Sequence, residues 1–363
     1  MATISQSQVP TTAAVEGVSR RNALFRRGST TALVTLLGLV IMAVFLMPIG
    51  YMMTTAFKQD TQLAAQHAPL MPAAAATFTY QGKALPLYNV PSADGVKQWA
   101  LVHGYREDSD FIDPAHADKG VFNWKGRYRT LDPVYQFAPT TDNFTTAWDQ
   151  VQFPILFRNT LLIAIISTIG TLISCILVAY GFARFKIPGK NVLFVILIST
   201  IVLPPQATII PLYILFAKLG WTGTWLPLLV PAFFANAYDV FLLRQYFMAI
   251  PKELDEAAML DGANPLQTLI RVIIPQAIPA ITAVTLFHFF FTWNDYFAPL
   301  VYLVGKEDLY PISVGIAKFV GTFSQYPGRA MATAVMTILL PAVLFFFAQR
   351  QFMQGVVLTG VDK

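Results

Sequence analysis

Residues 251–275 read PKELDEAAMLDGANPLQTLIRVIIP. Acidic residues come first in this segment, where the positive end of a helix would stabilise them. Gly262 suits the left-handed conformation in which many helices end. Asn264 followed by Pro265, with Gln267 three residues after the asparagine, is typical of the start of another helix. The segment is therefore predicted to form two short helices joined by a turn on the protein surface.

The first of these predicted helices carries a stripe of mostly small side chains. Its members recur at intervals of three and four residues and so share one face: Leu254, Ala257, Ala258 and Asp261. Another surface could approach that face closely, and acidic residues flank it. We expect this helix to lie in a groove of a partner and to pass rigid-body motion to the segments on either side.

The chain around this segment is strongly apolar. Of its 363 residues 55% are hydrophobic and 12% charged, whereas a soluble domain has about 25% charged residues. Six apolar stretches are long enough to cross a hydrocarbon core about 30 Å thick. They are Thr31–Met53, Thr160–Phe182, Val192–Phe216, Trp225–Phe247, Gln276–Ala298 and Arg329–Ala348. The predicted fold class is therefore an all-α membrane protein with six transmembrane helices.

The third stretch is interrupted by Pro204-Pro205-Gln206. Proline removes a backbone donor and crowds the preceding turn of a helix. We expect either a kinked helix or a short span followed by an interfacial helix, and count one crossing.

Basic residues fall into four groups between or beyond the spans. The groups are Arg20, Arg21, Arg26 and Arg27; Arg184, Lys186 and Lys190; Arg244, Lys252 and Arg271; and Arg350 and Lys363. With six spans all four groups lie on one side, which the positive-inside rule makes the cytoplasm. Both termini are then cytoplasmic. The net charge of +5 reflects this topology, and no nucleic-acid partner is expected because no basic run is interleaved with aromatic residues.

The predicted organisation has five parts. They are a cytoplasmic tail (1–30), a first transmembrane helix (31–57), an extracytoplasmic insert (58–157), a core with five transmembrane helices and a cytoplasmic loop at 248–275 (158–350), and a cytoplasmic C-terminal tail (351–363). The insert contains turn-rich aromatic clusters, Tyr80–Lys83 and Phe122–Tyr128, which predict short strands joined by turns. It could contact a soluble protein or a second membrane subunit, or it could be a cap that packs on the outer face.

The segment quoted first resembles the EAA motif of permease subunits in binding-protein-dependent ABC importers. The matching residues are Glu256-Ala257-Ala258, Asp261-Gly262-Ala263 and Ile274-Pro275. The resemblance implies the type I ABC importer permease fold. It also implies that the loop is the coupling helix that docks on an ATP-binding subunit, with Glu256 and Gly262 as its most characteristic residues.

Further matches make the chain similar to the maltose-type sugar permeases. They are Leu203-Pro204 with Ile210–Tyr213, Trp293–Tyr296 with Pro299-Leu300, and Gln349–Phe352 followed by Gly355 and Gly360. The resemblance implies import of a sugar or oligosaccharide by alternating access. The insert is longer than in that group and the tail departs from its glycine-rich ending, which leaves the solute open.

An energy source is expected outside this chain. The phosphate-binding loop is absent, because Asn191 follows Gly189-Lys190 and Glu307 follows Gly305-Lys306. We therefore expect no catalytic residue, metal or cofactor here, and ATP and Mg bound by partner ATPase subunits. The resemblance implies these partners in a bacterial inner membrane: a second permease in a heterodimer, two ATP-binding subunits, an extracytoplasmic solute-binding protein, the sugar and membrane lipid.

Polar residues in two of the spans are candidates for the solute path. They are Asn236, Tyr238 and Asp239 in the fourth span, and His288, Trp293, Asn294, Asp295 and Tyr296 in the fifth. Polar groups at membrane depth usually face a bundle interior or a wet cavity. Their spacing places Asn236 with Asp239, and His288 with Asp295, on shared faces. Amides and carboxylates can satisfy sugar hydroxyls while aromatic faces cover C–H surfaces.

Structural roles for these residues remain open. Asn236 and Asp239 could bond a neighbouring helix, and His288 could be an interhelical contact. Trp293 could belong to an interfacial aromatic belt, and Asp295 could cap the end of its span.

Three other functions are alternatives to sugar import. An importer of the same build could carry a polyamine, phosphate or glycerol phosphate. A gradient-driven secondary transporter would predict duplicated halves, which are not evident. A membrane enzyme could use His67, His103 and His116 of the insert, but their spacing fits no compact metal motif.

Overall fold

The computed structural model describes residues 12–65, 68–92, 94–322 and 326–357. The chain divides into two compact units, residues 1–54 and 55–363. Helix α1 (Thr12–Ala56) makes up the described part of the first unit. Its apolar portion, Thr31–Ala56, covers the first predicted span. The predicted tail is helical from Thr12, and residues 1–11 lie outside the described part.

Residues 73–137 form antiparallel strands. The strands are β1 (Ala73–Ala75), β2 (Thr77–Tyr80), β3 (Lys83–Ser92), β4 (Gly95–Gly104), β5 (Ser109–Ile112), β6 (Val121–Trp124), β7 (Asp132–Pro133) and β8 (Tyr135–Phe137). One sheet has the order β2-β3-β4-β5-β6, with β7 also paired to β3, and β1 pairs with β8. Two 3₁₀ helices, η1 (Pro114–Lys119) and η2 (Tyr128–Thr130), interrupt the strands. The short strands predicted for this segment are confirmed.

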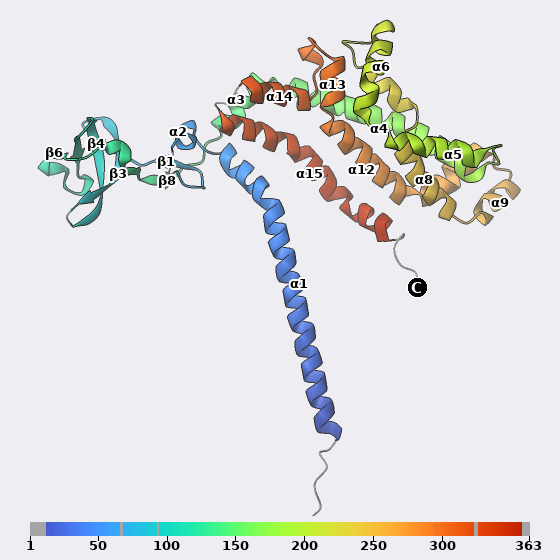
Figure 1. Cartoon of the computed structure of the whole chain (residues 1–363), viewed down its shortest axis with the longest axis horizontal. Coiled ribbons are helices and arrows are strands. Elements are labelled where there is room, and N and C mark those ends of the chain that lie inside the picture. The colour runs from blue at the N-terminus through green and yellow to red at the C-terminus, as the bar shows by residue number, and fades with distance from the viewer. Residues whose placement is uncertain (1–11, 66–67, 93, 323–325, 358–363) are drawn as a thin grey trace, which may run out of the picture. The chain divides into compact units, whose positions relative to one another are not determined.

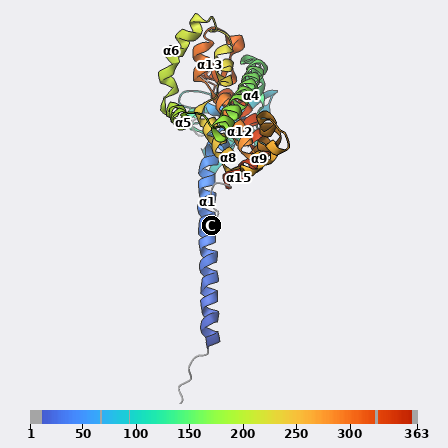
Figure 2. The same cartoon turned by 90° about the vertical axis from the view of Figure 1, so that its right-hand side faces the viewer.

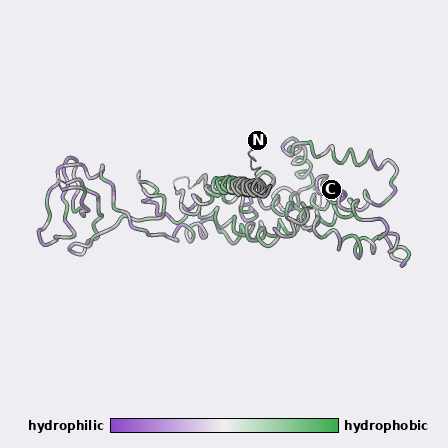
Figure 3. Tube along the Cα trace, turned by 90° about the horizontal axis from the view of Figure 1, so that it is seen from below, coloured by the Kyte–Doolittle hydropathy of each residue, from purple (hydrophilic) through white to green (hydrophobic). Residues whose placement is uncertain are grey.

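The β2–β3 hairpin shows why the sequence folds this way. Gln81 and Gly82 have φ angles of 48° and 77°, as a two-residue hairpin turn of the favoured twist requires. Val90 of β3, Ala100 of β4 and Phe111 of β5 are fully buried. Hydrophobic and hydrophilic residues are mixed along this part of the trace (Figure 3), and the buried side chains give the sheet its own apolar core.

The remaining residues are almost entirely helical. The helices are α2 (Asp60–Leu63), α3 (Asp142–Gln150), α4 (Phe153–Arg184), α5 (Lys190–Ser199), α6 (Pro205–Lys218), α7 (Leu226–Leu229), α8 (Ala237–Ala249), α9 (Glu253–Leu260), α10 (Pro265–Thr268), α11 (Ile274–Gln276), α12 (Ile278–Asn294), α13 (Phe297–Tyr302), α14 (Ile312–Thr322) and α15 (Pro327–Val357). Short 3₁₀ segments are η3 (Thr200–Val202), η4 (Val230–Phe233) and η6 (Glu307–Leu309), and η5 (Leu269–Ile273) is π-helical. Helices α4, α8 and α12 pack together (Figure 1).

Several predicted boundaries are corrected. Helix α4 begins at Phe153, so the last residues assigned to the insert are helical. Pro154 is compatible with this start, because proline is accepted in the first turn of a helix. Helix α12 ends at Asn294 and not at Ala298. Helix α15 continues to Val357, so the predicted C-terminal tail is helical at its start. Residues 358–363 lie outside the described part.

Proline breaks the third predicted span, as expected. Helices α5 and α6 meet at 100° across the Pro204-Pro205 pair (Figure 2). The fifth span is also bent, by 83° between Pro265–Gln276 and Ile278–Asn294. Within the described residues, four helices are long and apolar enough to cross a membrane, and up to six if each bent pair counts as one span.

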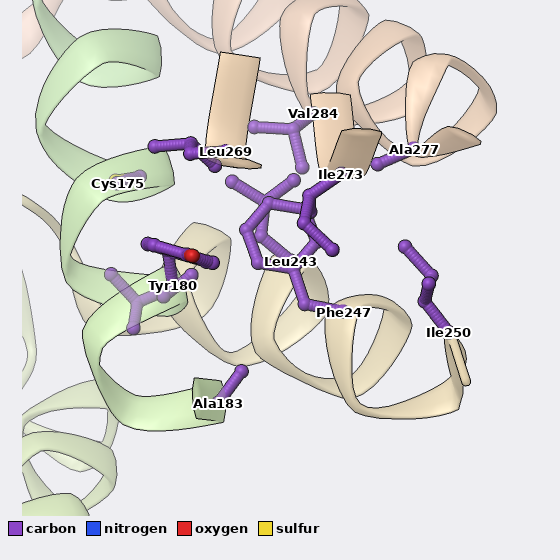
Figure 4. Close-up of a cluster of buried hydrophobic side chains, with 12 residues drawn as sticks. Cys175, Tyr180, Ala183, Leu243, Phe247, Ile250, Leu269, Ile273, Ala277 and Val284 are labelled. Carbon is purple, nitrogen blue, oxygen red and sulfur yellow. The ribbon is translucent and has the colours of Figure 1, made fainter. Parts of the chain in front are cut away.

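One buried cluster joins α4, α8 and the segment from η5 to α12. Figure 4 shows Cys175 and Tyr180 of α4 facing Leu243 and Phe247 of α8, with Ile273 closing the other side. Cys175, Leu243, Phe247 and Ile273 are fully buried. This cluster holds the C-terminal part of α4 against the segment from η5 to α12, which follows helices α9 and α10.

Candidate functional site

The segment at residues 251–275 forms the two predicted helices. Helix α9 ends before Gly262, which has a φ of +78°. The Gly262 N–H donates to the Met259 carbonyl (3.0 Å) and the Ala263 N–H to the Ala258 carbonyl (2.9 Å). A Cβ at Gly262 would meet no atom within 4 Å. Glycine is thus favoured here by the backbone angle and not by lack of space.

A capping box opens the second helix. The Gln267 N–H donates to the Asn264 side chain (2.9 Å), and the Asn264 N–H donates to the Gln267 side chain (2.8 Å). Both bonds satisfy backbone donors that the helix start leaves free. The predicted turn between the two helices is therefore confirmed at both ends.

An ion pair that the sequence did not indicate fixes α9 to α4. Arg184 Nε lies 2.7 Å from Asp255 Oδ2, and the two side chains are only 7% and 9% exposed. Arg184 also donates to the Ile250 carbonyl (3.0 Å). Burial raises the pKa of the Asp255 carboxyl, and the adjacent Arg184 guanidinium offsets part of that rise. The pair joins the last turn of α4 to the first turn of α9.

The outer face of α9 differs from the predicted stripe. Ala258 is buried and shares the inner face with Asp255, three residues earlier. The other stripe members, Leu254, Ala257 and Asp261, are exposed, as are Glu256, Gly262 and Pro275, while Ala263 is half-buried. Met259 and Leu260 are 62% and 90% exposed. The predicted site did not include these two apolar side chains. Their position between Ala258 and Asp261 of the EAA motif could have indicated that they belong to the same exposed surface.

A pocket of about 250 Å³ lies between α4, η4, the start of α8 and α12. Its polar lining comes from Thr160, Ser167, Thr171, Asn236, His288, Thr292 and Asp295. Phe234 and Phe291 supply aromatic surface, and four prolines shape the wall. Hydroxyl, amide and carboxylate groups beside aromatic faces suit a polyhydroxylated solute.

His288 is the centre of a polar network beside this pocket. Its Nε2 lies 3.0 Å from Ser167 Oγ and 3.1 Å from Thr171 Oγ1. Thr171 donates to the Ala232 carbonyl (3.2 Å), so Ser167 is the hydroxyl left to donate to an unprotonated Nε2. His288 Nδ1 faces Asp239 Oδ2 at 3.6 Å. The network thereby links α4, α8 and α12.

Asn236 caps α8 and does not lie inside a continuous helix. Its Oδ1 accepts from the Asp239 N–H (2.9 Å), and its Nδ2 donates to Asp239 Oδ2 (2.6 Å). The spacing of three residues that indicated a shared helical face is here the spacing of an N-cap. Asn236 and Asp239 still come together, with Asp239 buried behind the pocket.

The other predicted path residues lie in three kinds of place: in the pocket lining, in the buried core and on the surface. His288 and Asp295 both line the pocket. Trp293 is 1% exposed and packs on Phe289 (5.6 Å between ring centroids), so it does not belong to an interfacial belt. Three further residues are exposed and do not line the pocket: Tyr238, Asn294 and Tyr296.

Three pocket residues of α4 were missed by sequence reasoning. Thr160, Ser167 and Thr171 are buried and spaced seven and four residues apart on one helical face. Hydroxyl residues at that spacing in an otherwise apolar helix could have indicated a polar face of α4. The described residues contain no group of three or more histidine, cysteine or acidic side chains placed to hold a metal. His67 lies outside them, and His103 and His116 are exposed.

Comparison with known proteins identifies the family. Residues 170–356 match the family described as binding-protein-dependent transport system inner membrane component. The chain belongs to this family. It is therefore a multi-pass membrane protein, and the resemblance to permease subunits of binding-protein-dependent importers is confirmed.

Two relatives show the extent of the similarity. This inner membrane component is 35% identical, over 57% of its length and 70% of the relative's, to the osmoprotective compounds uptake permease protein of Synechocystis. It is 30% identical, over 59% of its length and 78% of the relative's, to the lactose transport system permease protein of Rhizobium radiobacter. Both similarities span more than two thirds of the relative.

A solved structure shares the fold. One chain of a bacterial ABC transporter involved in the import of the acidic polysaccharide alginate superimposes with a TM-score of 0.64. The superposition covers 90% of this component and 97% of that chain, at 21% sequence identity. This similarity confirms the overall fold that was predicted, that of a type I importer permease.

Proposed function

We propose that this component is one of two membrane-spanning subunits of an ATP-driven importer for a sugar or oligosaccharide. Its family membership and the lactose permease among its relatives support the proposal. In this proposal each bent helix pair crosses the bacterial inner membrane as one span, which gives six spans and cytoplasmic termini. Residues 58–157 then lie outside the membrane, near a solute-binding protein.

The single observation that carries the coupling role is the fixed position of α9. Arg184 and the Gly262 turn hold its inner face against the core, while Glu256, Met259 and Leu260 remain exposed. Exposed apolar side chains beside charged ones suit a protein interface. We assign this face to an ATP-binding subunit that holds ATP and Mg and drives the motion.

The pocket supports a neutral solute. Its lining among the described residues contains Asp295 but no lysine or arginine, so a glycerol phosphate or phosphate would meet no basic side chain there. A pocket of about 250 Å³ is also small for an oligosaccharide, which agrees with a path completed by a second permease. A polyamine is the second candidate solute, because the Asp295 carboxylate in the pocket lining would attract a cation.

Co-purification from native membranes tests the assembly. Tagged wild-type protein is compared with Glu256→Lys, and with Lys83→Gln as a control on a distant exposed lysine. We expect an ATPase and a second permease with the wild type and the control, and loss of the ATPase from Glu256→Lys. Purification of the wild type without any ATPase would overturn the importer assignment. Uptake of labelled maltose or lactose, with putrescine as competitor, then separates a sugar from a polyamine importer.

A further inference from the structure

A second cleft lies in the β-strand segment, away from the pocket of the helical core. It measures about 780 Å³, within the range of about 300–1,000 Å³ usual for small-molecule sites. Two loops line it, residues 104–107 between β4 and β5 and residues 127–129 after β6. The family match begins at residue 170 and so does not include this cleft.

The floor of the cleft is built by close packing. Tyr128 lies so near Gly104 that a Cβ on Gly104 would collide with the tyrosine ring. The same ring meets Tyr88 edge to face (6.3 Å between centroids), and Tyr88 in turn meets the fully buried Phe111 (6.4 Å). Tyr128 is therefore anchored to the core of the sheet and holds the loop that carries its neighbours.

The charges in the cleft are mostly positive. Arg106, Arg127 and Arg129 line it together with one carboxylate, Glu107. Arg106 and Arg127 are exposed and form no ion pair or side-chain hydrogen bond with the described residues. Arg129 lies against the Tyr128 ring and donates to its hydroxyl (3.3 Å). Two guanidinium groups are thus available to an anion.

The next two acidic residues along the chain after Glu107 are hydrogen-bonded to Asn123. Asn123 Nδ2 donates to Asp108 Oδ2 (3.1 Å) and to Asp110 Oδ1 (2.9 Å). These bonds hold the two carboxylates beside β6, and neither residue lines the cleft. Glu107 is therefore the one carboxylate among the residues that line the cleft.

We propose that this cleft binds a carboxylate-bearing saccharide, such as a uronic acid unit of an oligosaccharide. Guanidinium groups hold carboxylates by paired, charge-assisted hydrogen bonds. The rings of Tyr105, which is 54% exposed, and Tyr128 give flat surfaces for the C–H faces of a sugar. The concave form of the site favours a saccharide over the acidic surface of a partner protein, because protein interfaces are flatter and larger.

Titration calorimetry tests the proposal with the full chain in phosphatidylcholine nanodiscs. The probe is trigalacturonate, and its methyl ester is the matched ligand without charge. We expect the wild type to bind trigalacturonate at least about tenfold more tightly than the ester. The Arg106→Gln/Arg127→Gln variant should lose about tenfold or more of that affinity, since each lost charged hydrogen bond costs about tenfold. Lys83→Gln, on a different turn of the same sheet, should bind as the wild type does.

Three outcomes would overturn the proposal. They are equal affinity of the double arginine variant and the wild type, equal affinity for the ester and the acid, and tighter binding of polyglutamate than of trigalacturonate. The last result would assign the cleft to an acidic protein partner. Circular dichroism melts of all variants exclude unfolding as the cause of a loss. The assay involves no transport, so its failure would leave the proposed importer function untouched, and failure of that function would leave this site standing.

Discussion

Arg184 Nε and Asp255 Oδ2 lie 2.7 Å apart and join the last turn of α4 to the first turn of α9, with both side chains nearly excluded from solvent. Helices α5, α6, α7 and α8 lie between the two residues along the chain. A displacement of α9 by a partner therefore acts on α4 directly, and α4 lines the pocket with Thr160, Ser167 and Thr171. This gives a continuous physical connection from the proposed ATPase contact to the proposed solute path.

Arg184→Gln is expected to lower the stability of the folded protein and weaken retention of an ATPase. Removing one partner of a buried pair leaves the other charge without compensation, which costs about 3–5 kcal/mol. Thermal melting in detergent and co-purification measure the two effects. Arg271→Gln removes an exposed charge from the same surface and should leave the melting temperature within about a degree. Equal melting of Arg184→Gln and wild type would contradict this role.

The loss in Arg184→Gln should depend on pH. Burial already raises the pKa of Asp255, and removing the guanidinium removes the larger of the two charge effects, those of Arg184 and Lys252, that offset the rise. A carboxyl whose folded pKa lies above its unfolded value contributes most stability when protonated and loses that contribution as pH rises through the folded pKa. The gap in melting temperature from wild type should therefore be smaller at pH 5 than at pH 7. A gap that widens on acidification would show that Asp255 is not the uncompensated group.

The ends of the two short helices were readable from the sequence because they depend on local chemistry. Gly262 ends α9 with a positive φ, and Asn264 with Gln267 closes the capping box, each within a few residues. The break at Pro204-Pro205 has the same origin. The Arg184–Asp255 pair could not be predicted, because it depends on how α4 and α9 meet.

The pocket was predicted only in part for a related reason. Asn236 and Asp239 were expected to share a helical face, but η4 interrupts the helix and makes Asn236 an N-cap. The polar residues of α4 were missed because a threonine or serine in an apolar helix can bond its own backbone, as Thr160 does with the Leu156 carbonyl (2.7 Å). The role of Ser167 and Thr171 at the pocket depends on α12, which brings His288 against them.

Gly262→Ala is expected to destabilise the turn after α9 by about 1–2 kcal/mol, because a Cβ is disfavoured at positive φ. No steric clash adds to this cost, since the space around Gly262 is open. Gly262→Asn should cost less, because asparagine tolerates the left-handed region. Hydrogen exchange of residues 258–268 measures the difference: exchange should be fastest in the alanine variant and intermediate in the asparagine variant. Equal exchange in all three proteins would mean that the angle does not control the turn.

His288→Phe is expected to lower both stability and solute uptake. The substitution removes the group that faces Asp239 and the partner of Ser167 and Thr171. Thr171 keeps the Ala232 carbonyl and Asp239 keeps Asn236, so the buried Ser167 hydroxyl is the group left unsatisfied, at about 1–3 kcal/mol. Ser167→Ala is the matched control, because it removes one hydroxyl from the same network and leaves His288 facing Thr171 and Asp239. Its melting temperature should fall by less than that of His288→Phe. Because His288 and Ser167 also line the pocket, uptake at limiting solute should fall in both variants, and an unchanged uptake in both would remove this pocket from the path.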